Sequence, residues 1–241
     1  MTENQQNLGR QSFNRGIRIL EILAEGGASS ASAIAAELGI NQSSASRLLQ
    51  SLQQAGLVYK PSFHSFALDL GILRLAGIAM TSFPIVKEAV NVCNELHRTY
   101  AYGFSVATLE QGNLLHLAKI QENADAAIEM VESKSFPISQ SSMGRCLAAI
   151  RGRDDFFALL KNEGCPNQEI KTLWRESTEG GAAPGEIYLK GVGFNRSNAA
   201  RVFERNGRHY ALAVFSQTKT ISPQKAKTCL TLGIQKLTPK P

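Results

Sequence analysis

The stretch AIAAELGINQSSASRLLQSLQQAGLV, residues 33–58, decides the fold of the N-terminal part of this chain. Ile34, Ala35 and Leu38 form one apolar stripe, which predicts a short helix that Gly39 ends. Asn41 predicts the N-cap of a second helix, with an alanine at 45 and leucines at 48, 49 and 52 on one face. Two short helices joined by a turn of roughly three to four residues that contains glycine predict a helix-turn-helix.

The segments on either side of this stretch complete a small domain. Residues 15–25, RGIRILEILAE, have a broad apolar face that predicts a helix, and Gly26-Gly27 ends it. Ser30 or Ser32 is the candidate cap of the next helix. After Gly56, residues 57–60 and 65–68 alternate in polarity around a turn at residues 61–64, which predicts a β-hairpin wing.

The polar face of the second helix indicates a surface for DNA. No Asp or Glu lies between Gly39 and Gly56, and a carboxylate there would repel phosphate. Amide and hydroxyl side chains can read base edges, and the arginine can bond a guanine or a phosphate. We therefore expect the candidate base-reading residues to be Gln42, Ser43, Ser44, Ser46, Arg47 and Gln50. The alternative is a solvated face rich in serine and glutamine.

Further basic side chains can position the domain on the DNA backbone without reading its sequence. The candidates are Arg15 and Arg18 on the first helix, and Lys60 and His64 in the wing. Each could equally be a surface charge with no partner.

Composition sets limits on the whole chain. The 241 residues suffice for two small domains, and 43% hydrophobic with 19% charged residues is typical of a soluble globular protein. The net charge of +6 favours a polyanionic partner only mildly. The N-terminus lacks an apolar signal segment, and no run is long enough to span a bilayer, so we expect a cytoplasmic protein without a membrane partner.

The sequence offers no metal, cofactor or catalytic site. The four cysteines and four histidines are scattered, whereas a structural zinc site needs closely spaced ligands. Cys146 has no histidine or acid near it in sequence. The motifs G-x-S-x-G, H-E-x-x-H and G-K-[ST] are absent, so we do not expect an enzyme.

The remaining sequence predicts a linker helix and a second domain. The expected divisions are a flexible tail at 1–11, the winged helix-turn-helix at 12–69, a linker helix at 70–83 and a larger domain at 84–241. The linker's apolar face could pack against a second subunit or against the chain's own C-terminal domain. Pro84 can open the helix that follows.

Alternating strands and helices are expected in the larger domain. Strands are predicted at 104–108, 114–120 and 127–131, and helices at 143–150, 153–161, 168–176 and 223–237, with a loop at 180–185. A final hairpin turns at Asn206-Gly207. A sheet flanked by helices is the α+β arrangement of GAF-like sensor domains.

Three segments resemble the IclR-type transcriptional regulators. They are SFNRGIRILEILAE with residues 33–58, then FP at 136–137 with SQSSMGRCLAAI at 139–150, and GVGF at 191–194 with ARVFERNGRHYALAVFS at 200–216. The resemblance covers about Ser12 to Leu237. It implies a two-domain fold, in which a mainly α winged helix-turn-helix and an α+β GAF-like domain are joined by a linker helix.

The resemblance also implies a small organic effector, a carboxylate or an aromatic compound, in the C-terminal domain. A helix start at Ser141, Ser142, Met143 and Gly144 suits a carboxylate, although it could be an ordinary serine cap on a buried helix. Phe104 and Val214 could line apolar walls or belong to the core, and Asn195 and Ser216 are candidates through the resemblance alone. Asn195 replaces an acidic residue and Val214 a serine of the family pattern, so the pocket is expected to be less charged.

Together these features predict a DNA-binding transcriptional regulator whose operator affinity changes with a bound effector. Homodimers, or dimers of dimers, would place two recognition helices in successive major grooves of a near-palindromic operator in double-stranded DNA. The alternatives are an architectural DNA-binding protein without an effector and an enzyme that uses the C-terminal pocket.

Overall fold

A computed structural model describes residues 3–124, 137–179, 185–192 and 195–238, without side-chain detail at 3–9 and 190–195. The chain divides into two compact units, Met1–Ser82 and Phe83–Pro241. Each unit has its own hydrophobic core and is described separately.

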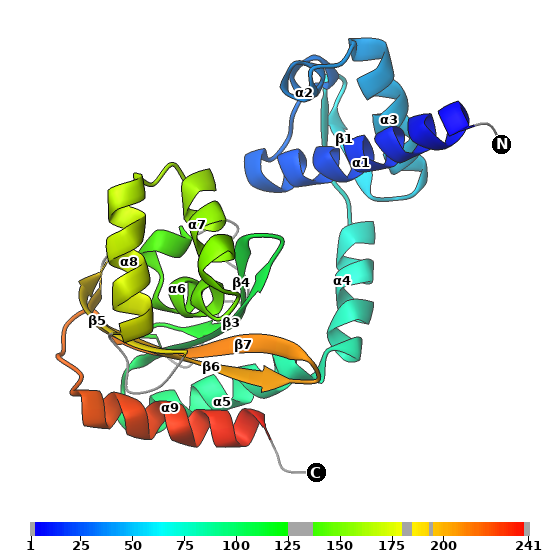
Figure 1. Ribbon diagram of the computed structural model, residues 1–241. Coiled ribbons are helices and arrows are strands. Elements are labelled where there is room, and N and C mark those ends of the chain that lie inside the picture. Colours follow the sequence, from blue (N-terminus) through cyan, green and yellow to red (C-terminus); the bar gives the residue numbers. More distant parts are fainter. Residues whose placement is uncertain (1–2, 125–136, 180–184, 193–194, 239–241) are drawn as a thin grey trace. The chain divides into compact units, whose positions relative to one another are not determined.

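Three helices form the body of the N-terminal unit. They are α1 (Glu3–Gly26), α2 (Ala31–Leu38) and α3 (Gln42–Gln54) (Figure 1). Ser30 caps α2 by accepting a hydrogen bond from the N–H of Ala33 at 3.2 Å. Gly39 ends α2 in the left-handed conformation, φ 63°, which is open to glycine at little cost. The cap and the turn are those that the sequence predicts.

A hairpin and a further helix follow. Strands β1 (Val58–Ser62) and β2 (Ser65–Leu68) pair antiparallel, and α4 (Gly71–Ser82) comes next. The turn is shorter than the sequence predicts, because strand pairing extends to Ser62 and Ser65. The core of the unit combines α1, α2, α3 and both strands through the buried residues Ile19, Ile22, Leu23, Ile34, Leu49, Val58 and Phe66.

The first helix is longer than expected. It begins at Glu3 rather than near Arg15 and so takes in most of the segment that the sequence predicts as a flexible tail. No proline interrupts residues 3–26, and Glu, Gln and Leu are good helix formers, so the helix can extend beyond its buried turns.

A five-stranded antiparallel sheet forms the centre of the C-terminal unit. The strands are β3 (Gly103–Glu110), β4 (Asn113–Ile120), β5 (Glu186–Val192), β6 (Asn195–Arg205) and β7 (Arg208–Ser216). Their spatial order is β4-β3-β7-β6-β5. The β6–β7 hairpin turns at Asn206 and Gly207, both with positive φ, as predicted from the sequence.

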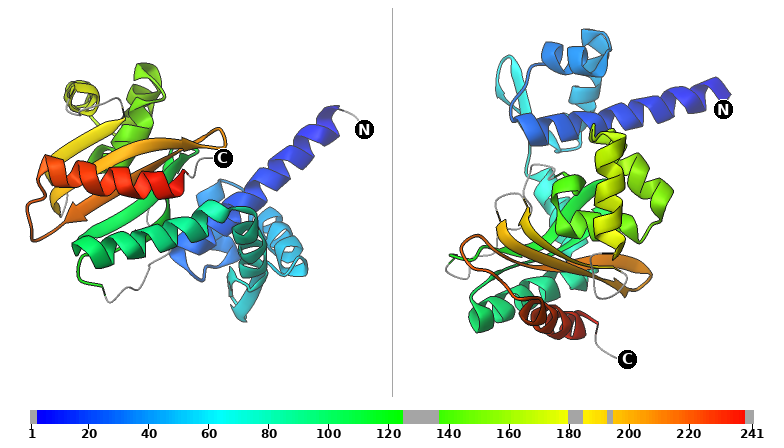
Figure 2. Two further views of the ribbon diagram at one scale, coloured as in Figure 1. Left: turned by 90° about the horizontal axis from the view of Figure 1, so that it is seen from below. Right: turned by 60° about the vertical axis from the view of Figure 1, so that its left-hand side comes forward.

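Helices cover both faces of this sheet (Figures 1 and 2). Helices α5 (Pro84–Tyr100) and α9 (Pro223–Leu237) pack on one face, which we call the α5/α9 face. The 3₁₀ turn η1 (Ile138–Gln140) and helices α6 (Ser142–Ala149), α7 (Arg153–Asn162) and α8 (Asn167–Glu179) pack on the other, the α6 face. The unit is therefore the predicted α+β domain.

A bulge in the β3–β4 hairpin changes the alternation of β4. Val106 pairs with Ala118, but Ala107 pairs with His116, so Leu117 has no partner in β3. As a result, Ala118 and Ile120 lie on the α5/α9 face, whereas Leu114 lies on the α6 face.

The predicted helices of this unit agree with α5 to α9 to within a few residues at each end. The predicted strand at 127–131 and most of the loop predicted at 180–185 lie outside the described residues.

Candidate functional site

The polar face of α3 is the best-defined candidate site of the N-terminal unit. Ala45 and Leu49 are fully buried, which turns the opposite side of the helix outward. The six predicted residues all lie on or beside that side: Gln42, Ser43, Arg47 and Gln50 are exposed, and Ser44 and Ser46 are half-buried. The structure therefore brings them together on one helix.

The start of α3 is held by Asn41. Its side-chain oxygen accepts hydrogen bonds from the N–H of Ser44 and the hydroxyl of Ser43, both at 2.8 Å. Because the Ser43 hydroxyl already has this acceptor, it is left as an acceptor for groups outside the helix.

The charge of this surface is positive. No Asp or Glu lies between Ile40 and Leu68, so α3 and the wing contain no acidic residue. Within the described part of the chain, no side chain forms an ion pair with Arg47. An exposed guanidinium of this kind can bond a phosphate or a guanine with two parallel N–H groups.

The two candidate arginines of α1, Arg15 and Arg18, differ in how available they are to a phosphate. Arg18 forms ion pairs with Glu21 at 3.0 Å and with Glu37 at 3.6 Å. The hydrogen bond to Glu21 raises the pKa of Arg18. A phosphate would have to compete with both carboxylates for Arg18, whereas Arg15 is half-buried and has no described carboxylate partner.

The wing is small and carries an exposed aromatic ring at its tip. The side-chain oxygens of Ser62 and Ser65 are 2.6 Å apart across the turn, and the Lys60 ammonium lies 4.9 Å from the centre of the Phe66 ring. Phe63 is 85% exposed and meets His64 edge to face. The sequence places Phe63 in the turn but does not mark it as a functional residue.

In the C-terminal unit, α6 begins at the predicted serines. The hydroxyl of Ser141 accepts a hydrogen bond from the N–H of Gly144 at 3.0 Å, so that N–H is not free for a ligand as the sequence suggests. A Cβ on Gly144 would lie 3.0 Å from the Cα of Ile138, so the glycine allows η1 and α6 to pack closely. The structure thus gives Gly144 a packing role.

Ser142 has a partner that the sequence does not indicate. Its hydroxyl donates to Oδ1 of Asn198 on β6 at 2.7 Å, and both residues are buried. The pair lies on the α6 face next to Ala200, which contributes to the core there. The alternation of side chains along β6 could have predicted that Asn198 faces this side of the sheet. Only the packing of α6 on the sheet shows that Ser142 contacts it.

The other predicted ligand residues with described side chains lie on both faces of the sheet. Phe104 and Val214 are a cross-strand pair, fully buried on the α5/α9 face. Met143 is buried in the core of the α6 face. Asn195 is the first residue of β6. The predicted set is therefore divided between the two faces of the sheet.

Ser216 lies at the end of β7 and contacts Glu122. Its hydroxyl is 2.8 and 2.9 Å from the two carboxylate oxygens of Glu122, which follows β4. Hydrogen bonds from this serine and its neighbours lower the pKa of Glu122 although burial acts to raise it. Nothing in the sequence singles out Glu122, because its partners lie more than ninety positions away.

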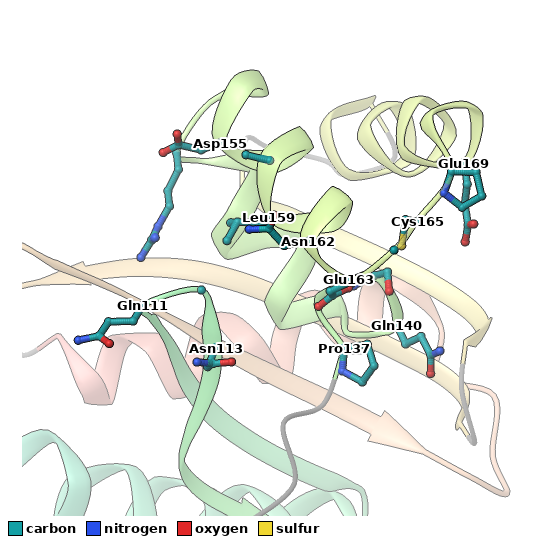
Figure 3. A pocket seen from close by; sticks show the side chains of 16 residues that line it. Gln111, Asn113, Pro137, Gln140, Asp155, Leu159, Asn162, Glu163, Cys165 and Glu169 are labelled. Carbon is teal, nitrogen blue, oxygen red and sulfur yellow. The ribbon is translucent and has the colours of Figure 1, made fainter. Parts of the chain in front are cut away.

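A cavity of about 920 Å³ lies elsewhere, between the β3–β4 turn, η1, α7 and α8 (Figure 3). Gln111 and Asn113 line it from the turn, Asp155 and Asn162 line it from α7, and Glu163 lines it directly after α7. Glu163 also accepts hydrogen bonds from the backbone N–H groups of Ile138 and Ser139, at 2.5 and 3.1 Å. None of the seven predicted ligand residues whose side chains the structure describes lines this cavity.

The cysteine in the predicted ligand segment is unreactive in this fold. Cys146 is fully buried, and its thiol contacts the carbonyl oxygen of Ala200 at 3.8 Å. Burial raises its pKa, so the thiol stays protonated at neutral pH. This geometry does not suit a nucleophile.

No helix in the described ranges is long and apolar enough to cross a membrane. The class of the protein follows from its fold and its α3 surface: it is a winged helix-turn-helix protein with an additional α+β domain.

Comparison with known proteins relates the N-terminal unit to a family of helix-turn-helix domains. Residues 12–62 match the IclR helix-turn-helix domain family. An HTH-type transcriptional regulator of Escherichia coli K12, RhmR, is 26% identical over 138 residues, which is 57% of this chain and 53% of that protein. The chain is thus aligned with about half the length of this curated relative.

Solved structures extend the likeness to both units. An IclR regulator from Silicibacter sp. TM1040 has a TM-score of 0.77 at 20% identity and is covered over 94% of each chain. An IclR homologue from Microbacterium hydrocarbonoxydans, complexed with 4-hydroxybenzoate, has a TM-score of 0.70 at 16% identity, over 94% of this chain and 97% of that one. Residues 12–62 therefore form an IclR-type helix-turn-helix domain, and the chain shares the two-domain fold of these structures.

Proposed function

We propose that the chain is a sequence-specific DNA-binding transcriptional regulator whose affinity for its operator changes when a small organic effector binds the C-terminal unit. The observation that carries the proposal is the acid-free, outward-facing side of α3 within a helix-turn-helix of the IclR type. An α-helix fits the major groove of B-DNA, and this face presents donors and acceptors for base edges there.

We assign base reading to α3 and backbone contacts to the wing. Arg47 has the geometry to bond a guanine with two N–H groups, while Gln42 and Gln50 are long enough to reach neighbouring bases. Lys60 and His64 lie on an exposed hairpin suited to phosphate contacts.

For the effector we propose a small carboxylate or aromatic compound near the start of α6. The buried Ser142–Asn198 pair supplies polar groups on the α6 face of the sheet. The 4-hydroxybenzoate bound by the structural relative belongs to this chemical class. It is therefore the first compound to test, alongside any ligand that mass spectrometry finds co-purified with the native protein.

We further propose that two copies pack through α4. This helix has no buried residue in the single chain, and Leu70, Leu73 and Ile78 are 73%, 66% and 59% exposed. Apolar surface on this scale is unfavourable in water and favours association. A dimer would place two recognition helices on one operator.

The decisive experiment removes the Arg47 side chain. The operator is first selected from a random DNA library with the parent protein, and affinities are measured by fluorescence anisotropy. Loss of one two-bond guanine contact costs about 1–3 kcal/mol, so Arg47→Ala should weaken operator binding by about 5- to 150-fold.

Arg175→Ala is the matched control, since it removes the same charge from an exposed position on α8 and should change affinity little. If the parent protein binds operator and scrambled DNA equally, the sequence-specific function is wrong. If Arg47→Ala binds as the parent does, α3 is not the reading helix.

A further inference from the structure

The carboxylate of Glu122 is surrounded by hydrogen-bond donors from a single loop. The hydroxyls of Ser216 and Thr218 donate to it at 2.8–2.9 Å. The backbone N–H groups of Gln217 and Thr218 donate at 2.9 and 3.4 Å. The ammonium of Lys219 lies 3.6 Å away. Such a concentration of donors is how proteins hold an ionised carboxylate.

The loop that supplies these donors is held by its own contacts. The hydroxyl oxygen of Ser216 accepts the N–H of Lys219 at 2.7 Å, which directs the serine proton toward Glu122. The ammonium of Lys219 also donates to the carbonyl oxygen of Ala101 at 3.2 Å, and Arg196 donates to that of Thr218 at 3.3 Å. These contacts do not involve Glu122, so the donors should converge even when that carboxylate is removed.

The occupant is well shielded from water. The Glu122 side chain is only 4% exposed, and Ser216 is fully buried. A buried carboxylate is costly unless donors satisfy it, and buried donors are equally costly without an acceptor. Loop and carboxylate therefore form a complete site in which the ligand belongs to the chain itself.

We propose that the loop Ser216–Lys219 is a carboxylate-binding site that Glu122 fills as an internal ligand, and that Glu122 thereby excludes free carboxylates from Ser216. The proposal rests on the effector role proposed above and narrows it. An effector of this chain does not place an anionic group on Ser216, the serine that the family resemblance assigns to the ligand. Because the fold holds Glu122 beside the loop, its effective concentration is far above that of a group on a flexible linker, so free carboxylates compete poorly.

Removal of the internal ligand tests the proposal, with formate as the probe. The variants are Glu122→Ala, which empties the site, Glu122→Gln, which fills it with an uncharged amide, and Glu110→Ala as an exposed control on β3. Thermal unfolding of the full chain is followed through Trp174, the only tryptophan, which lies in the C-terminal unit. Sodium chloride at equal ionic strength controls for salt effects.

Glu122→Ala should lower Tm by several degrees, and formate should restore about half or more of that loss in a saturable manner that chloride does not reproduce. The parent protein, Glu122→Gln and Glu110→Ala should respond to formate as they do to chloride. If Glu122→Ala is unfolded in chloride, its far-ultraviolet circular dichroism should show folding when formate is added.

Absence of formate rescue or formate-dependent folding in Glu122→Ala would overturn the proposal. Equal stabilisation of the parent protein by formate would also overturn it, because free carboxylates would then reach the loop. Neither measurement involves DNA, so failure here is distinguishable from failure of the regulatory function.

Discussion

The four thiols of the chain differ in burial, and their reactivity should differ accordingly. Cys93, Cys146 and Cys229 are buried, whereas Cys165 is partly exposed beside the cavity near α7. Burial raises the pKa of Cys93 to about 12 and that of Cys229 to about 11. The thiolate is the nucleophile, so buried neutral thiols react slowly.

We predict that iodoacetamide modifies Cys165 first in the native protein. Peptide mass spectrometry after short labelling should find Cys165 alkylated and Cys93 and Cys146 unmodified until denaturant is added. Alkylation of Cys146 at the rate of Cys165 would contradict the buried position of α6.

Single residues whose roles are local could be predicted from the sequence. The caps Ser30 and Asn41 and the turn at Gly39 depend on neighbours within four positions, which the sequence shows directly. Residues whose partners are distant could not. The pairing of Arg18 with Glu37, of Ser142 with Asn198 and of Ser216 with Glu122 depends on how elements pack.

At the scale of elements, the start of α4 depends on a glycine. A Cβ on Gly71 would lie 2.1 Å from the carbonyl oxygen of Gly56, whereas a Cβ on Gly77, in the same helix, would meet nothing within 4 Å. The first contact involves backbone, which cannot move aside as a side chain can.

We therefore predict that Gly71→Ala separates the start of α4 from the end of α3, at a cost of about 1–3 kcal/mol. Hydrogen–deuterium exchange should become faster in peptides that cover residues 56–75. Gly77→Ala is the control and should leave that exchange unchanged or slower, because alanine favours helix. Equal exchange in both variants would show that the close approach at Gly71 does not support the helix.

An ion pair joins β6 to α5. Arg205 bonds both carboxylate oxygens of Glu88, one of them at 3.0 Å. The hydrogen bond from Arg205 lowers the pKa of Glu88 from its usual 4.5, although burial acts in the opposite direction. A carboxyl with a lowered folded-state pKa stabilises the protein above its unfolded pKa and loses that effect as the pH falls through the folded pKa.

Glu88→Gln should accordingly lower the free energy of unfolding near neutral pH, by about 0.5–1 kcal/mol for this partly exposed pair. Urea unfolding followed by Trp174 fluorescence should show the difference from the parent shrinking as the pH falls below about 4. A difference that stayed constant over this range would mean that the charge of Glu88 does not contribute.

The positions of most elements could be predicted from the sequence, but their partners could not. Turn and cap residues mark the ends of helices, and alternation marks β6 and β7. The order β4-β3-β7-β6-β5 places strands from opposite ends of the domain side by side. For that reason the sequence leaves Phe104 and Val214 as either pocket walls or core, whereas the structure shows them in the core of the α5/α9 face.

At the scale of the whole molecule, α4 should decide the state of association. We predict that Ile78→Lys, which places a charge in its exposed apolar surface, shifts the protein toward monomer in sedimentation velocity. Operator affinity should fall with it, because two half-sites are then bound separately. Leu115→Lys, which places the same charge at an exposed apolar position on β4, is the control and should sediment as the parent does. An unchanged Ile78→Lys would place the interface elsewhere.

The bulge at Leu117 has a consequence for insertions and deletions in homologous chains. Leu117 has no partner in β3. Its loss would therefore leave the other residues of β4 on their present faces of the sheet. Loss of a residue between 113 and 116 would instead turn the β4 residues on one side of the deletion toward the opposite layer of helices. Natural length variation in this hairpin should therefore concentrate at the bulge or in the turn, while the paired positions between them keep their spacing.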